Sequence, residues 1–216
     1  MHWTGLPLLF CLARADDPSG TTRRVGRLAV ALGAATEADE EQVIRAALAR
    51  MAGVALRYVG SHDEAMDCAQ DALIRAVRAF DSFEGRASVT SWLHRIAVNC
   101  ALEQLRRRGR RQEVSIDELM PSFDDQGFLN DSLVVSDDSA ETMLQRADAR
   151  AAVTSAIQAL PESHRTVLLL RDIEEMSIDE VAERLEISHG TAKVRIHRAR
   201  SALRKHLEPL IAAGEL

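Results

Sequence analysis

The chain has 216 residues, of which 46% are hydrophobic and only 4% are aromatic. This length and composition allow one or two small helical cores and exclude one large core rich in aromatic side chains. The formal net charge is −6, but acidic and basic residues are segregated along the chain, so the average does not exclude an anionic partner. No apolar run approaches the roughly 18 residues of a membrane-spanning helix, and we expect no membrane span.

The N-terminal segment is predicted to be a poorly ordered extension over residues 1–39, which an upstream start codon would also explain. Residues 6–12 are apolar and Ala13-Arg14-Ala15 resembles a cleavage site, so a secretory signal is an alternative. The segment is short, however, and has no basic start. Cys11, Cys68 and Cys100 lack metal-site spacing, and an odd, sparse set is typical of reduced thiols in a cytoplasmic protein. We expect no metal and no cofactor.

Three apolar stripes at helical spacing follow from about residue 40. They predict two helices separated by Gly60-Ser61, then a loop over residues 81–88, and a third helix that ends in a run of arginines. The stripes consist of Val43, Ala47, Met51, Val54 and Tyr58, then Ala65, Ala69, Ala72, Leu73, Ala76 and Phe80, then Trp92, Leu93, Ile96, Ala97, Cys100 and Leu105. The sequence therefore predicts a helical domain over residues 40–111.

An acidic segment separates this domain from the C-terminal part. Between residues 113 and 148 there are ten acidic residues and one basic residue, Arg146. With Pro121, Gly127 and many serines, residues 112–139 are predicted to form a flexible linker. We expect a second helical domain over residues 140–210, with Pro161 at the start of one of its helices.

The charge changes sign inside this second domain. Acidic residues from Asp172 to Glu186 are followed by basic residues from Lys193 to Lys205. Apolar residues at helical spacing predict two short helices, formed by Ile178, Val181, Ala182 and Leu185 and by Ala192, Ile196, Ala199 and Leu203. Such a pair with a basic second member is typical of a helix-turn-helix whose second helix enters the major groove. The alternative is a solvated, charged hairpin in another kind of bundle.

Capping residues support the helix pair. Ser177 with Glu180 predicts a capping box at the first helix, and Ser188 is placed to cap the second. Glu186 occupies the turn position where a left-handed backbone favours glycine, at a cost of roughly 1 kcal/mol. The predicted fold class is all-α, with two small helical domains joined by an acidic flexible linker and a C-terminal helix-turn-helix.

These residues resemble the bacterial sigma-70 family, and within it the small extracytoplasmic-function (ECF) sigma factors. Residues 160–165, 177–182 and 187–200 are similar to the promoter-recognising domain. Residues 67–80, 83–85, 91–97 and Asn99 are similar to the core-binding and melting domain. The resemblance covers roughly residues 40–207, and two matches in the family's order are more specific than either alone.

The resemblance implies a non-enzymatic, cytoplasmic subunit that directs RNA polymerase to promoters. Its implied partners are core RNA polymerase, through the clamp helices of the largest subunit and the flap region, promoter DNA and an anti-sigma factor. The C-terminal domain would bind the −35 element, with Lys193, Val194, His197 and Arg198 toward base edges. The remaining implied −35 residues, mostly near phosphates, are Ser188, His189, Thr191, Arg195 and Arg200.

The N-terminal domain would open the −10 element. By resemblance, the loop over residues 84–89 captures a flipped-out base, and Trp92 lies either in the core or against the separated strands. The implied −10 residues are Arg86, Ser88, Trp92, Arg95, Asn99, Arg106, Arg107 and Arg108. The implied polymerase-docking residues are Asp67, Gln70, Asp71, Leu73, Ile74 and Arg78. The acidic linker would thread through the basic polymerase cleft.

Other functions share part of this pattern. A helix-turn-helix repressor or activator would share the C-terminal half without binding core polymerase, and it would bind duplex DNA alone. A site-specific recombinase would need a strand-rich catalytic domain with a nucleophile beside clustered arginines. An adaptor or anti-sigma protein would leave the basic second helix unexplained. The sigma factor hypothesis uniquely predicts specific initiation when the chain is added to core polymerase.

Overall fold

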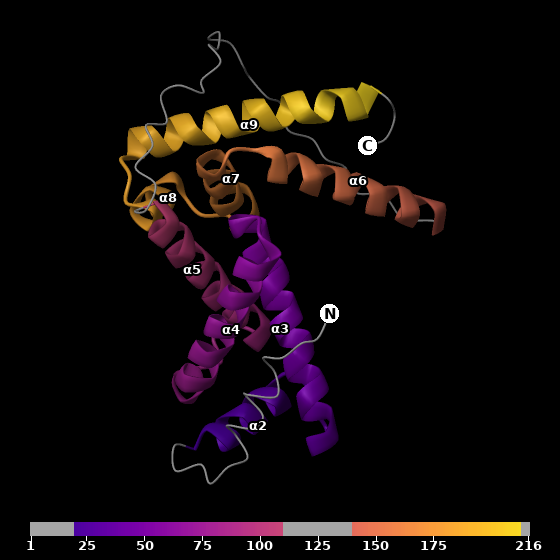
Figure 1. Ribbon diagram of the computed structural model, residues 1–216, viewed down its shortest axis with the longest axis vertical. Coiled ribbons are helices and arrows are strands. Elements are labelled where there is room, and N and C mark those ends of the chain that lie inside the picture. The colour runs from indigo at the N-terminus through magenta and orange to yellow at the C-terminus, as the bar shows by residue number, and fades with distance from the viewer. Residues whose placement is uncertain (1–19, 110–139, 213–216) are drawn as a thin grey trace. The chain divides into compact units, whose positions relative to one another are not determined.

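The computed structural model describes residues 20–109 and 140–212, which form two compact units divided near residue 110 (Figure 1). Every regular element among these residues is a helix, so the predicted all-α class is confirmed. The predicted acidic linker over residues 112–139 and the first 19 residues of the predicted extension lie outside the described residues.

The first unit is built on three mutually packed helices, α3 (Glu37–Val59), α4 (His62–Ala79) and α5 (Val89–Gly109). The predicted stripes supply Met51, Tyr58 and Leu73 to its core, and Leu102, which the stripes did not include, is buried with them; each is at most 2% exposed. Between them lie fully buried alanines, whose small side chains let the helix backbones approach closely. Gly60 ends α3 with a φ of 76°, a conformation that glycine adopts without strain.

Helix α2 (Thr21–Ala31) was not predicted, because it lies in the segment interpreted as a poorly ordered extension. Val25, Leu28 and Ala29 are buried where α2 packs against α3 and α4 at one end of the bundle (Figure 1). Their i, i+3, i+4 spacing is a helical signal, but one of only two turns. The packed part of this unit therefore includes residues N-terminal to residue 40, back at least to α2.

The second unit contains α6 (Ala140–Ala159), α7 (Glu162–Leu168), α8 (Ile178–Leu185) and α9 (His189–Ala212). A π-helical turn, η3 (Leu169–Ile173), extends α7. Pro161 is the N-cap of α7, as the sequence predicts. The core joins Val167 and Leu170 to Val181 of α8 and to Ala192 and Ala199 of α9, all of them fully buried.

The helix pair α8–α9 has the predicted caps. The Glu180 amide donates to Ser177 Oγ (3.2 Å) and the Ser177 amide donates to Glu180 Oε2 (2.7 Å). The Thr191 amide donates to Ser188 Oγ (3.1 Å) at the start of α9. Glu186 has the predicted left-handed backbone, with a φ of 56°. The local start and stop signals of the helix-turn-helix are therefore confirmed.

Candidate nucleic-acid interface

Helix α9 has one buried face and one basic face. Ala192, Ile196 and Ala199 are at most 5% exposed, while Lys193 and His197 are exposed and Arg195 and Arg198 are half-buried. Val194 is 47% exposed. The predicted inward face is confirmed for these three residues, whereas its fourth member, Leu203, is half-buried. The outer face presents hydrogen-bond donors and one apolar group, the kinds of group that contact base edges in a major groove.

Two arginines of α9 influence a histidine on α7. Burial, together with the positive charges of Arg195 and Arg198, lowers the pKa of His164. A neutral imidazole is therefore favoured beneath this part of α9 at neutral pH. His164 is half-buried in the unit where α7 packs against α9.

Arg200 is bound by an acid from another element. Its Nη2 and Nε donate to Asp172 Oδ1 and Oδ2 at 2.5 and 3.1 Å, and this pairing raises the pKa of Arg200. The sequence interpretation assigned Arg200 to a DNA phosphate without predicting this pair. The two oxygens of the Asp172 carboxylate thus satisfy the same pair of guanidinium donors that a phosphate could accept from.

The start of α9 is engaged in internal contacts. Ser188 caps the helix and its hydroxyl lies 2.7 Å from the hydroxyl of Thr191. His189 Nε2 lies 3.6 Å from Asp179 Oδ1 on α8. These residues therefore fix the geometry of the helix pair, and both hydroxyls and the imidazole remain exposed.

In the first unit, three aromatic rings meet where α4 passes through the short turn η1 (Phe80–Ser82) toward α5. The ring centroids of Phe80 and Phe83 are 6.0 Å apart, and Trp92 lies 6.1 Å from Phe80 and 5.1 Å from Phe83. Trp92 is half-buried, so it packs against these rings and keeps one part accessible. The two sequence hypotheses for Trp92 are thus compatible.

The predicted strand-separation loop is exposed from Glu84 to Ser88. Arg86 pairs with Glu84 and its side chain is 85% exposed. Ser88 caps α5, because its Oγ accepts the Ser91 amide hydrogen bond at 3.0 Å. On α5 itself, Arg95 is exposed and Asn99 is half-buried.

The arginine run at the end of α5 is not uniform. Arg106 and Arg107 are exposed, whereas Arg108 Nη1 donates to Glu64 Oε2 of α4 at 2.9 Å. Arg108 therefore also joins α4 to α5, a role that the sequence does not indicate.

Of the six α4 residues predicted to dock on polymerase, five are exposed or half-buried and one is buried. Asp67, Asp71 and Arg78 are exposed, and Gln70 and Ile74 are half-buried. Leu73 is 1% exposed, so its assignment to this face was wrong. It packs in the core because α4 is covered by both α3 and α5.

Comparisons with known proteins agree with this division. The family model for sigma-70 region 2 matches residues 43–111, and the model for sigma-70 region 4 matches residues 150–203. The RNA polymerase sigma-H factor of Pseudomonas aeruginosa is 38% identical over 162 residues, which cover 75% of this chain and 82% of that protein. The chain belongs to the sigma-70 family.

Two further relatives place this sigma factor in the ECF group. It is 37% identical to the ECF sigma factor SigW of Bacillus subtilis, over 71% of this chain and 81% of the relative. It is 35% identical to the ECF sigma-E factor of Escherichia coli, over 75% and 83%. The resemblance inferred from the sequence is confirmed, and the protein is an RNA polymerase sigma factor.

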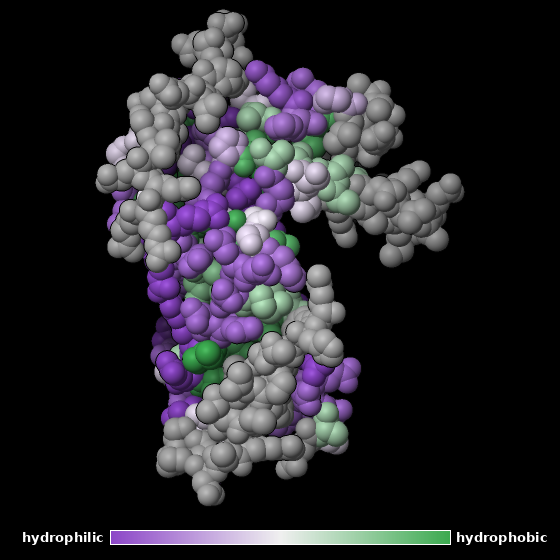
Figure 2. All heavy atoms as spheres, in the orientation of Figure 1, coloured by the Kyte–Doolittle hydropathy of each residue, from purple (hydrophilic) through white to green (hydrophobic). Residues whose placement is uncertain are grey.

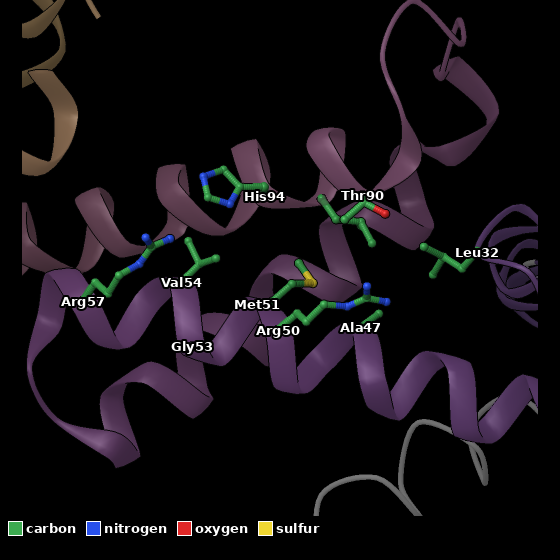
Figure 3. Close-up of a pocket in the computed structure, with 10 residues that line it drawn as sticks. Leu32, Ala47, Arg50, Met51, Gly53, Val54, Arg57, Thr90 and His94 are labelled. Carbon is green, nitrogen blue, oxygen red and sulfur yellow. The ribbon is translucent and has the colours of Figure 1, made fainter. Parts of the chain in front are cut away.

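A pocket of about 330 Å³ lies between α3 and α5 of this sigma factor (Figure 3). Met51, Val54 and Leu93 line it together with Arg50, Arg57 and His94. Thr90, Leu93 and His94 line it from α5, and at 3.6 residues per turn they lie opposite Trp92, Arg95 and Asn99. The pocket is therefore separate from the predicted −10 face.

The described surface contains little exposed apolar area apart from isolated residues. Figure 2 shows hydrophilic residues over most of the visible face of the described parts. Large exposed apolar side chains are Val30, Ile173, Val194 and Ile211. Within residues 20–109 and 140–212, no group of three acidic, histidine or cysteine residues could hold a metal ion, and no helix is long and apolar enough to cross a membrane.

Three further ionic contacts, all in the first unit, were not predicted. Arg75 on α4 forms two hydrogen bonds with Glu103 on α5, at 2.8 and 2.7 Å. Arg24 and Arg27 of α2 both bind Asp81. Each pair joins residues at least 28 positions apart, and no spacing in the sequence predicts such contacts.

Proposed function

We propose that this sigma factor binds core RNA polymerase and directs it to promoters that contain −10 and −35 elements. The observation that carries the proposal is the capped helix pair α8–α9, with its basic outer face, in one chain with the aromatic turn and exposed loop of the first unit. A repressor needs only the helix pair. A chain that must also separate the DNA strands needs the helix pair together with the aromatic turn and loop of the first unit.

For the −35 element, we assign base contacts to Lys193, Val194, His197 and Arg198, because they lie outward from the buried face of α9. Thr191 and Arg195 suit phosphates. Ser188 and His189 act at the helix start, where amide groups and the helix dipole favour an anion. Arg200 reaches a phosphate only by exchanging its bonds to Asp172.

For the −10 element, we assign the exposed loop around Arg86 and Ser88 to an unstacked base and Trp92 to stacking at its edge. Arg95 and Asn99 follow on the same face of α5, which suits the junction between duplex and separated strands. The exposed Arg106 and Arg107, with Arg108 beside them, suit the DNA backbone.

For polymerase, we assign Asp67, Gln70, Asp71, Ile74 and Arg78 of α4 to the clamp helices, and the second unit to the flap region. The acidic and half-apolar character of this α4 face fits a basic protein partner better than DNA. We also infer, from the family, control by an anti-sigma factor, action in the cytoplasm and no enzymatic activity of the chain alone.

The test is reconstituted transcription. Core polymerase with and without the chain is incubated with genomic DNA, and the transcript 5′ ends are mapped. We expect new start sites that share two upstream motifs and disappear when the chain is omitted. Duplex binding by the free chain without any initiation would instead support a helix-turn-helix repressor or activator.

A further inference from the structure

An acid in η1, directly after α4, joins the unpredicted helix α2 to the predicted strand-separation region. Arg24 Nε donates to Asp81 Oδ2 at 2.7 Å, and Arg27 Nη1 donates to Asp81 Oδ1 at 2.6 Å. Both carboxylate oxygens are therefore bound by guanidinium groups of a single helix. These bonds lower the pKa of Asp81, chiefly through Arg24, so the carboxylate stays ionised at neutral pH.

One of these two arginines, Arg27, also contacts the aromatic cluster. The Arg27 guanidinium carbon lies 5.6 Å from the centre of the Phe80 ring, within the range of a cation–π contact. Phe80 in turn contacts Phe83 and Trp92. One guanidinium group thus touches both the carboxylate and the first ring of the cluster that includes Trp92.

Helix α2 provides a fixed base for these contacts. Leu28 and Ala29 are fully buried and Val25 is 6% exposed. The helix packs against α3, α4 and η1. Because its apolar face is fixed in the core, Arg24 and Arg27 are held at a defined distance from the turn.

The loop over residues 84–88 is held at its two ends by different contacts. Its N-terminal end leaves from Phe83, inside the aromatic cluster, and its C-terminal end is fixed by the Ser88 cap on α5. Between them Glu84, Gly85 and Arg86 are exposed, and Gly85 has a φ of 70°. The conformation of this short loop is therefore set by where η1 and Trp92 are placed.

We propose that Asp81 is a positioning residue for promoter opening: bound by Arg24 and Arg27, it holds η1, Phe83 and Trp92 so that the loop is shaped before it meets the −10 element. The inference rests on the proposed function of this loop. A preorganised site avoids the ordering cost at the moment of strand separation. Loss of the carboxylate should slow opening and leave −35 binding and polymerase docking intact.

The test compares Asp81→Asn with a matched control, Glu103→Gln. Both substitutions remove a carboxylate that receives two arginine hydrogen bonds within the same unit, but Glu103 joins α4 to α5 away from the loop. Each variant is combined with core polymerase on a promoter mapped as described above. The template is either fully duplex or already unpaired across the −10 element.

We expect Asp81→Asn to lower initiation on the duplex template by roughly three- to tenfold, the range that losing two exposed ion pairs allows. Initiation on the unpaired template should remain at the wild-type level, because opening is no longer required. Glu103→Gln should leave the ratio between the two templates unchanged. Arg27→Gln, which keeps Arg24, should give a smaller change in the same direction as Asp81→Asn.

Three results would overturn the inference: wild-type activity of Asp81→Asn on the duplex, an equal loss on both templates, or the same template ratio for Glu103→Gln as for Asp81→Asn. Absence of initiation by the wild-type protein on either template would be a different failure. It would reject the proposed function itself, since the unpaired template bypasses the step assigned to Asp81.

Discussion

Asp172 in the π-helical turn η3 binds Arg200 of α9 through both carboxylate oxygens, at 2.5 and 3.1 Å. The pair joins the acidic turn η3, which precedes the helix-turn-helix, to the fourth turn of its basic helix α9. It therefore joins the two sides of the charge reversal seen in the sequence. Because the carboxylate imitates a phosphate, it also reduces the charge that α9 offers to DNA.

Replacing Asp172 with Asn should release Arg200. For the holoenzyme formed with core polymerase, we plot the logarithm of the DNA-binding constant against the logarithm of the salt concentration. We expect the slope to become steeper by about 1, which corresponds to one additional phosphate contact. The free energy of unfolding should fall by no more than about 1 kcal/mol, since both side chains are partly exposed. Binding is measured across a salt titration.

Glu183→Gln is the control for this change in net charge, because Glu183 is an exposed acid on α8. It should leave the salt dependence near the wild-type value. An unaltered slope for Asp172→Asn would show that Arg200 does not reach a phosphate even when it is released.

Arg198 and Arg200 should differ in the kind of DNA binding they support. Arg198→Ala should relax the preference at one −35 position, at a cost of roughly 1 to 3 kcal/mol. Arg200→Ala should weaken binding evenly across sequences, and by less, because Arg200 is already paired with Asp172. Affinities for a panel of −35 variants measure both effects, and identical profiles would reject the assignment of helix faces.

The sequence was most informative where structure is decided locally. The caps and the turn of the helix pair depend only on residues a few positions apart. Their four predicted residues were placed correctly: Ser177, Glu180, Glu186 and Ser188. The inward face of α9 followed from helical period alone. Order of the two motifs along the chain then identified the family.

The sequence was least informative where contacts join distant segments. Leu73 lies on a helical stripe whose width the sequence does not define, so the boundary between core and docking face was misplaced. Helix α2 has only two turns of apolar pattern. The pairs of Asp81 and of Asp172 depend on tertiary placement, which no local spacing encodes.

Leu73 and its neighbour Ile74 should separate folding from polymerase binding. Leu73→Ala should lower the free energy of unfolding by about 2 to 5 kcal/mol, because it empties a fully buried site. Ile74→Ala, at a half-buried position, should cost less stability and weaken core binding. Trp92 lies in the first unit and residues 140–212 contain no tryptophan, so in a Trp3→Phe background urea unfolding followed by tryptophan fluorescence reports on the first unit. Stable Leu73→Ala protein with lost core binding would restore Leu73 to the docking face.

The Arg75–Glu103 pair should contribute to acid sensitivity. The hydrogen bond from Arg75 lowers the pKa of Glu103 below its ordinary value of 4.5. The Glu103 carboxylate therefore takes up a proton more readily in the unfolded than in the folded chain. Its stabilisation of the fold is complete above pH 4.5 and is lost as the pH falls through the lower pKa of the folded state. Glu103→Gln should be less stable than the wild type at pH 7, and the difference should shrink below pH 4.5. A constant difference in urea unfolding at both pH values would reject this contribution.

Cys68 and Cys100 should be unreactive until the first unit unfolds. Both are free and buried, and the Cys68 thiol faces the Cys100 carbonyl oxygen at 3.9 Å. Burial raises the pKa of Cys68 to about 11 from an ordinary value of 9.0, and it also raises the pKa of Cys100. Since the thiolate is the reacting form, iodoacetamide should modify Cys68 at least roughly a hundredfold more slowly in the folded than in the unfolded protein.

Mass spectrometry of the labelled peptides, in a Cys11→Ser background, measures each site separately. Met51→Ala tests whether burial controls the reactivity. Met51 is buried in the core of the same unit, and it lies far from both cysteines in the sequence. The substitution should speed labelling by increasing the fraction of open molecules. Fast labelling of Cys68 in the wild-type protein, at a rate independent of such destabilisation, would show that the thiol is accessible in the native fold and that burial does not control its chemistry.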